Sequence, residues 1–295
     1  IDAKLSENKT SFSAKIVEDS TNYRFGIQGN IDGTGDDIYL NLEEPLYLNF
    51  NEWNVAQAAP LNISKLETIP EIKLFRENQS LFVEGDMSQL KVGLERFDIN
   101  NILQLIKFDS TTFKGEINGE LALGLEGDEA PINGDLSIDD ININDLNVGN
   151  IELKADKKGD LVNAVLTLLG DNNDLKINGD YQISNGNIDA NAVIKNIDLA
   201  PFEIFLKSIA ENVTGNINGK ISVKGTTEAP KVNGVIEMEN VSAKIVELGT
   251  QYTIQYGAIQ MSETSINPVI MLVDSAKSQA TLSGKIQHDL FQDFK

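Results

Sequence analysis

The chain has 295 residues, and its 24 Lys and Arg stand against 45 Asp and Glu, which gives a formal net charge of −21. Such an acidic surface repels nucleic acid and anionic lipid headgroups, so the composition argues against direct DNA binding and against a polybasic membrane anchor. Because the chain has no cysteine, disulfides, thiolate nucleophiles and cysteine metal sites are excluded.

Alternation of apolar and polar residues is the main signal along the chain, and it predicts β-strands. The alternation is clear at residues 38–42 and 46–50, and again at 188–194 and 252–256. Turn-forming pairs that contain Gly or Pro interrupt it. We expect about 16 to 20 strands, with antiparallel neighbours because the connections are short.

An Asn-Gly pair preceded by Ile or Val occurs five times, at residues 117–119, 132–134, 177–179, 217–219 and 232–234. Asn-Gly between alternating hydrophobic residues normally signals a tight hairpin. A hairpin would place Ile117 beside Glu120 and Ile217 beside Lys220, whereas an uninterrupted strand keeps the apolar residues on one face. We therefore predict that most of these pairs lie inside strands.

Read as uninterrupted strands, these segments carry an apolar face opposite a charged one. The residues predicted on the apolar face are Ile117, Leu121, Leu123, Ile132, Leu136, Ile138, Ile177, Ile217, Ile221, Val223, Val232, Ile236 and Met238. Six glycines share this face, namely Gly119, Gly134, Gly179, Gly219, Gly234 and Gly284. Since glycine inside a strand marks a bend or the close approach of another group, we predict that these glycines notch the apolar face.

A long internal repeat relates residues 97–139 to residues 197–239, at an offset of 100. It predicts approximate repeats over 97–196 and 197–295, with 1–96 as a partial upstream repeat. No Pro- or Ser-rich linker interrupts them, so we expect a single elongated region, 1–295.

Each repeat is expected to begin with a short amphipathic helix. In one repeat Asp198 is a candidate N-cap and Pro201 lies in the first turn. The residues with helical spacing there are Phe202, Phe205, Leu206 and Ile209, and those of the counterpart after Asp98 are Ile102, Leu105 and Ile106.

The apolar face needs a covering layer, and two short helices cannot cover so many strands. Either the sheet packs on itself, as a sandwich or solenoid, or it curls into a trough that a ligand fills. Glycines on the inner face favour sharp curling or room for a guest.

Catalytic chemistry has little support in the sequence. His288 is the only histidine, and a Ser-His-Asp site would have to be built around it. Asp32, Asp36 and Asp37 have the composition of a Ca²⁺ loop but not the EF-hand spacing, so we interpret them as an acidic turn. No phosphate-binding loop or dinucleotide fingerprint occurs. We therefore predict no enzyme activity, no catalytic or metal-ligating residues and no cofactor.

The segment "ENVTGNINGKISVKGTTEAPKVNGVIEMENVSA", followed by "GTQYTIQYGAIQM" and "VDSAKSQATLSGKIQHDLFQDF", resembles the C-terminal half of the TamB family, within the AsmA-like superfamily. The shared marks are a G-x-(I/L)-x-G-x-(I/L)-x-(V/L) strand, an Ala-Pro before a second (V/I)-N-G strand, and a late a-x-L-x-G-x-I-x-H-x-x-F run. Upstream, "LYLNFNEWNV" and "QSLFVEGDMSQLKVGLERFDINNIL" are similar to TamB repeats too.

This resemblance implies a β-taco, a long curved antiparallel sheet with an apolar concave interior. TamB-like proteins are anchored in the inner membrane of diderm bacteria, cross the periplasm and work with TamA, a BamA-like outer-membrane barrel. They are implicated in moving phospholipid to the outer membrane and in assembling outer-membrane proteins. We expect the membrane helix and the region that meets the barrel to lie outside this chain.

With the resemblance, the apolar-face residues become candidates for a lipid-binding groove, and phospholipids become the expected ligands. A continuous aliphatic surface suits acyl chains, which have no hydrogen-bond demand and gain roughly 0.8 kcal/mol per buried methylene. Two alternatives stay open. One is a chaperone-like scaffold for outer-membrane β-strands, and the other is a self-packed β-solenoid stalk.

Overall fold

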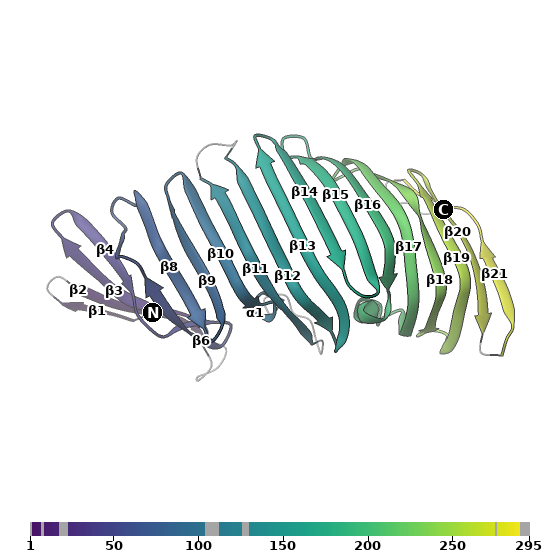
Figure 1. Cartoon of the computed structure of the whole chain (residues 1–295), viewed down its shortest axis with the longest axis horizontal. Coiled ribbons are helices and arrows are strands. Elements are labelled where there is room, and N and C mark those ends of the chain that lie inside the picture. The colour runs from purple at the N-terminus through teal and green to yellow at the C-terminus, as the bar shows by residue number, and fades with distance from the viewer. Residues whose placement is uncertain are drawn as a thin grey trace. The chain divides into compact units, whose positions relative to one another are not determined.

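The computed structural model describes residues 2–6, 9–17, 23–103, 112–125, 130–274 and 276–289. The chain divides into two compact units (Figure 1). Unit 1 comprises Ile1–Asp109 and Gly115–Ile138, and unit 2 comprises Ser110–Lys114 and Asp139–Lys295.

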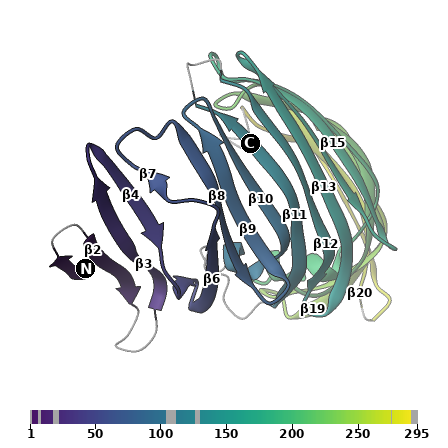
Figure 2. The same cartoon turned by 60° about the vertical axis from the view of Figure 1, so that its left-hand side comes forward.

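Unit 1 consists of antiparallel strands and one short helix. Its elements are β1 (Asp2–Ser6), β2 (Lys9–Val17), β3 (Tyr23–Thr34), β4 (Asp37–Leu42), β5 (Leu46–Leu48), β6 (Asn51–Gln57), β7 (Leu61–Asn62), β8 (Thr68–Arg76), β9 (Gln79–Asp86), β10 (Gln89–Asp98), α1 (Asn100–Leu103), most of β11 (Phe113–Gly124) and the first half of β12 (Ile132–Ile143). Strands β8 to β11 lie side by side (Figure 2), and each pairs with the next in antiparallel register.

Unit 2 also consists of antiparallel strands and one short helix. Its elements are the second half of β12, β13 (Leu146–Lys158), β14 (Leu161–Leu169), β15 (Asn173–Gln182), β16 (Asn187–Asp198), η1 (Ala200–Phe205), β17 (Ala210–Thr226), β18 (Pro230–Ile245), β19 (Thr250–Ser262), β20 (Ser265–Asp274), β21 (Gln279–Ser283) and β22 (Ile286–Gln287). From β13 to β20 every strand pairs with its chain neighbour. Within the described residues no pairing returns from β20 to β13, so the sheet is open.

The predicted fold class, an all-β protein with an open antiparallel sheet and two short helices, is confirmed. The described residues form 22 strands, more than expected, because very short strands such as β5, β7 and β22, with two or three residues each, count separately. All five Asn-Gly pairs lie inside strands, whereas the prediction was made for most of them. No helix in the described part of the chain has the length and apolar character needed to cross a membrane.

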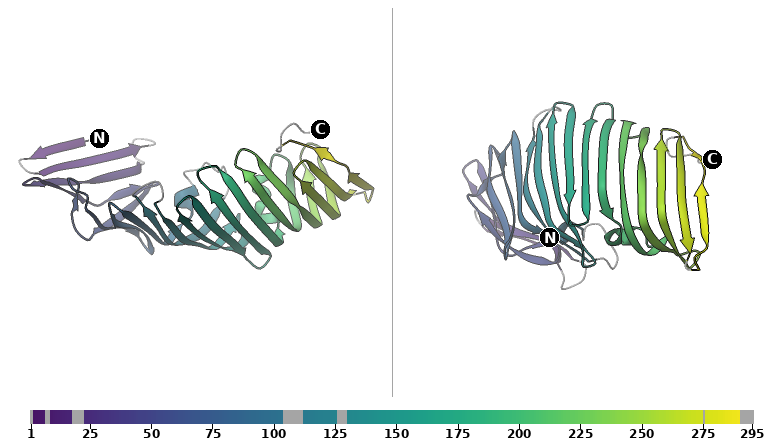
Figure 3. Two further views of the ribbon diagram at one scale, coloured as in Figure 1. Left: turned by 90° about the horizontal axis from the view of Figure 1, so that it is seen from above. Right: turned by 45° about the vertical axis from the view of Figure 1, so that its right-hand side comes forward.

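A line of β-bulges crosses the strands of unit 2. The register shifts between Ile194 and Ile197 in β16, and the pairing of β17 with β18 shifts on both sides of Thr214, first through an extra residue in β17 and then through one in β18. In β19 the shift toward β20 falls at Gln255, between Ile254 and Tyr256. Because a bulge bends its strand, bulges in adjacent strands crease the sheet along one line, which we call the crease. Figure 3 shows these strands side by side in a single curved layer.

The buried apolar side chains of unit 2 gather close to the crease. They include Val148, Leu168, Ile197, Val213 and Val241. In unit 1 the corresponding core is Trp53, Phe97 and Ile117, beside the bulge that separates Leu94 from Phe97 in β10. The rings of Trp53 and Phe97 lie 5.7 Å apart. Bending brings side chains of the concave face together, which explains why burial concentrates there.

Each of the two helices directly follows a bulged strand, α1 after β10 and η1 after β16, 100 residues apart. The Asp98 carboxylate accepts a hydrogen bond from Asn100 N, and the Asp198 carboxylate accepts one from Ala200 N. Likewise Ile99 N donates to Gly115 O, and Leu199 N donates to Gly215 O. The N-cap of η1 is Leu199, without a side-chain cap, so the predicted N-cap at Asp198 is wrong; Asp198 instead lies one residue earlier and holds the first helical N–H. Each helix is tied to the strand that follows it.

The expected amphipathic packing of the second helix is wrong in part. Helix η1 is a six-residue 3-10 helix, and the side chains of Phe205 and Ile209 are 55% and 62% exposed. A 3-10 helix aligns residues three apart, and β17 begins at Ala210, so the face expected for a longer α-helix does not form. In the first helix, Leu105 and Ile106 lie outside the described residues.

Asn173 links three elements at the crease and is only 2% exposed. Its side-chain nitrogen donates to Val148 O at 2.9 Å, and its side-chain oxygen accepts from Asp198 N at 3.0 Å. We expect Asn173→Ala to lower the free energy of unfolding by about 2–4 kcal/mol, because two buried backbone groups lose their partner. Urea unfolding followed by circular dichroism measures this loss.

Asn178, which is exposed on the same strand, provides the matched control. Asn178→Ala is expected to change the stability by no more than about 0.5 kcal/mol. Equal effects of the two substitutions would show that Asn173 does not hold the crease together.

Candidate functional site

The apolar faces of the two units are the largest features that sequence and structure share. In unit 2, cross-strand neighbours align into rows that run from strand to strand. One row contains Leu153, Leu166, Ile177, Ala192, Ile221, Gly234 and Met261. A second contains Ile151, Leu168, Leu175, Ile194, Gly219, Ile236 and Ile259. We use "apolar face" for the surface that these rows and their counterparts in unit 1 form.

The aliphatic residues predicted for this face in unit 2 all lie in cross-strand rows, whereas Gly284 lies between β21 and β22, outside the strands. Ile177 pairs with Ala192, which pairs with Ile221. The other pairs are Ile217 with Met238, Gly219 with Ile236, and Val223 with Val232. The opposite face carries Lys220 and Lys224, and both are exposed.

In unit 1 the predicted residues divide between a packed core and a more open surface. Ile117 is 6% exposed and packs in the Trp53 cluster, with Ile138 against it. Leu121 lies opposite Val92, and Leu123 lies opposite Leu90. The remaining three, Ile132, Leu136 and Gly134, lie on β12, where a side chain at Gly134 would contact Leu121.

Beyond the crease, the apolar face of unit 2 is half-buried. Ile177, Ile221, Val223 and Ile236 all fall between the buried and exposed classes. Figure 3 shows no second layer over this face among the described residues. The curvature shields neighbouring side chains from water in part.

A shallow depression of about 280 Å³ lies where β16, β17 and β18 meet. Ala192, Ile221 and Gly234 line it, but most of its lining residues have the parity of the opposite face, namely Asn191, Val193, Lys220, Ser222 and Asn233, so it is not a pocket of the apolar face. Gly234, directly opposite Ile221, has no room for a side chain, because a Cβ there would lie 2.2 Å from Lys220 O.

The predicted glycines fall into two groups. A Cβ on Gly119, Gly219 or Gly234 would lie 2.0–2.2 Å from a carbonyl oxygen of the neighbouring strand. Such a distance is impossible for a real side chain, so these three positions allow close approach of two backbones. The other three, Gly134, Gly179 and Gly284, have no backbone atom within 3.4 Å of a Cβ. Whether any of them notches the surface for a ligand stays a prediction.

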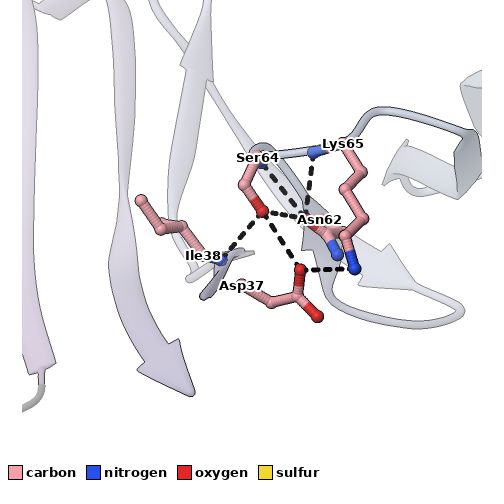
Figure 4. Close-up of polar contacts among 5 residues, drawn as sticks. All are labelled: Asp37, Ile38, Asn62, Ser64 and Lys65. Carbon is pink, nitrogen blue, oxygen red and sulfur yellow. Dashed lines mark hydrogen bonds and ion pairs between the residues drawn. The ribbon is translucent and has the colours of Figure 1, made fainter. Parts of the chain in front are cut away.

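The acidic turn is held by ordinary polar contacts (Figure 4). Lys65 Nζ lies 2.9 Å from the Asp37 carboxylate, and Ser64 Oγ donates to Asn62 at 2.7 Å. The hydrogen bond from Lys65 is the main reason why the pKa of Asp37 lies below its usual value. Asp32 instead accepts a hydrogen bond from Asn41, so the aspartates have separate partners.

The remaining candidates from the sequence are a metal site and His288. Within the described ranges, no group of three or more His, Asp or Glu side chains is arranged to hold a metal ion. His288 is buried, and its backbone N–H donates to Thr264 O beside the β19–β20 turn.

Lys157 was overlooked in the sequence. It lies on the apolar face, directly opposite Val162, and Val162 lies opposite Tyr181. The signal was present, because Leu153, Ala155 and Lys157 share one parity. The lysine was easily taken for the end of the strand.

A family model described as the N-terminal domain of TamB matches residues 77–238, more than half of the 295 residues. The sequence had been likened to the C-terminal half of that family, whereas the matching model describes its N-terminal domain. No curated protein and no solved structure matches the chain. The TamB family is associated with membranes, spans the periplasm and serves transport or assembly. The match covers β9 to β18, which contain most of the apolar face, and on this basis the chain belongs to the TamB family.

Proposed function

We propose that this chain is a periplasmic segment of a TamB-like bridge between the inner and outer membranes, and that its apolar face carries phospholipid acyl chains toward the outer membrane. The observation that supports this most directly is the run of half-buried aliphatic rows across the strands of unit 2, with no described layer over them. The proposed partners are phospholipids, a TamA-like or BamA-like outer-membrane barrel, and the inner membrane through a helix outside this chain.

Physical chemistry makes the apolar face suitable for acyl chains. Beyond the crease the rows of β14 to β18 contain mainly Leu, Ile, Val, Ala and Gly. Each methylene transferred from water to such a surface gains about 0.8 kcal/mol. The gain is nearly the same at neighbouring positions, so an acyl chain can move from strand to strand without a large barrier. Direction must then come from a lipid gradient or from an energy source elsewhere.

Photo-crosslinking in cells tests the proposal. A photoreactive amino acid at Leu121, Ile221 or Ile236 is expected to form phospholipid adducts, and one at Lys220 is expected to form few. Mass spectrometry of the purified adducts identifies the partner. Adducts with outer-membrane proteins alone would favour the chaperone-like scaffold instead, and adducts with neither would favour a structural stalk.

A further inference from the structure

A sixth Asn-Gly pair, Asn185-Gly186, differs from the five pairs that lie inside strands. It belongs to the turn between β15 and β16, and the side chain of Asn185 is exposed. Gly186 has a φ of 68°, a backbone conformation that glycine adopts easily and that tight turns often require. Of the six Asn-Gly pairs in the chain, only this one lies in a turn.

Asparagine followed by glycine is chemically reactive. When hydroxide removes the proton of the glycine backbone nitrogen, that nitrogen can attack Cγ of the asparagine side chain. A C–N bond closes a succinimide ring, and the side-chain nitrogen takes a proton from water and leaves as ammonia. Water then opens the ring at either carbonyl, which leaves aspartate or isoaspartate. Glycine favours the attack because it has no Cβ in the path of its nitrogen.

Strand pairing opposes this attack at the other five pairs. Gly179 pairs with Ala164 on one side and Ala190 on the other, so its N–H belongs to the hydrogen-bonded ladder. Gly219 and Gly234 also pair with residues on both neighbouring strands, and the remaining two pairs lie inside β11 and β12. Ring closure would bend an extended strand and remove this N–H, so the sheet must first open locally.

The contacts of the β15–β16 turn assist the same attack at Asn185. Asn187 N donates a hydrogen bond to Asn185 Oδ1 at 2.9 Å. This hydrogen bond stabilises the negative charge that the side-chain oxygen gains during the attack. Gly186 N donates to Gln182 O at 2.9 Å, but this bond lies in an exposed turn, where local opening costs less free energy than in a paired strand.

We propose that Asn185 is a site of spontaneous deamidation in the folded protein, and that the sheet protects the five Asn-Gly pairs inside its strands. This inference is independent of the proposed lipid transport. It assigns two outcomes to one dipeptide, and the difference between them is the hydrogen bonding of the glycine N–H.

Deamidation at Asn185 has a structural consequence, because the turn connects two neighbouring turns of unit 2. Ile183 N donates to Asp160 O in the β13–β14 turn, and Thr227 N in the β17–β18 turn donates to Gly186 O. Isoaspartate lengthens the backbone before Gly186, which displaces the Gly186 carbonyl from Thr227. The modified chain should therefore be less stable at this corner of unit 2.

Ageing of the purified chain in mildly alkaline buffer tests the proposal. Peptide mapping by mass spectrometry measures aspartate and isoaspartate at each Asn-Gly pair. Asn185 is expected to react at least about tenfold faster than Asn178 or Asn218, because these two need local opening of the sheet. In urea, where the chain is unfolded, the six pairs are expected to react at similar rates.

Asn185→Gln provides the matched control, because the longer glutamine side chain closes its ring much more slowly. After ageing, the unfolding midpoint of the wild type is expected to be about 2–4 °C lower than before, and that of the variant unchanged. Equal rates at Asn185 and at the strand pairs in the folded chain would overturn the site. Equal unfolding midpoints for fresh and aged wild type, with Asn185 converted, would overturn its structural consequence.

Discussion

Replacing Ile221 with aspartate is expected to reduce phospholipid transfer at least tenfold while leaving unit 2 folded. Ile221 lies in the middle of an apolar row, between Ala192 and Gly234, and it is half-buried. A carboxylate there would have to lose water whenever an acyl chain covered it, and such desolvation costs several kcal/mol. Because no described layer packs on this position, the carboxylate can stay hydrated in the absence of lipid, so the sheet should tolerate it.

Lys220→Asp is the matched control for this substitution. Lys220 precedes Ile221 on β17, but its side chain is exposed on the opposite face. The control is expected to change transfer less than twofold. Both variants are compared by the transfer of fluorescent phospholipid between vesicles and by circular dichroism. Normal transfer by Ile221→Asp, or unfolding of unit 2, would count against an open lipid-bearing face.

The face of each strand could be predicted from the sequence because the alternation of side chains is a local property. Lys220 and Ile221 fall on opposite faces whatever the neighbouring strand does. The same rule placed most of the Asn-Gly pairs inside strands, against their usual preference for turns. Membership of the TamB family was also accessible, since it depends on the order of motifs along the chain.

The crease could not be predicted in this way. A bulge such as the one between Ile194 and Ile197 depends on the register with β17, and register depends on contacts between residues far apart in the chain. The crease in turn decides which apolar residues are buried. Ile117 and Ile221 both lie on the apolar side of the alternation in their strands, yet Ile117 packs with Trp53 and Ile221 stays half-buried.

The form of the short helices was also not predictable from the sequence, for a different reason. The spacing from Phe202 to Ile209 indicated an amphipathic α-helix, but only six residues form η1 before β17 starts at Ala210. A helix of this length gains little from its own hydrogen bonds, so its form depends on the strands it joins. Asp98 and Asp198 were better guides to where the helices start, because each carboxylate accepts a local hydrogen bond from the first helical residue, although the N-cap of η1 is Leu199.

Gly119→Ala is expected to lower the stability of unit 1 by roughly 3 kcal/mol or more. A Cβ at this position would lie 2.0 Å from the carbonyl oxygen of Asp135 and 2.9 Å from the Cα of Leu136. Both are backbone atoms of β12, so no side-chain rotation relieves the contact. Gly119 also has a φ of 125°, a conformation that residues with a Cβ rarely adopt.

Gly134→Ala is the matched control, because it also adds a methyl group to a strand glycine but does not bring that group against the backbone of the neighbouring strand. Gly134 lies on the adjacent strand, and its nearest neighbour would be the flexible Cδ1 of Leu121, at 3.3 Å. Because that side chain can move and alanine restricts the unfolded chain, we expect a change within about 1 kcal/mol in either direction. Thermal unfolding should therefore show a midpoint at least about 6 °C lower for Gly119→Ala than for Gly134→Ala. Equal midpoints would mean that β11 and β12 can separate at no cost, and the glycines would then have no part in bringing these strands together.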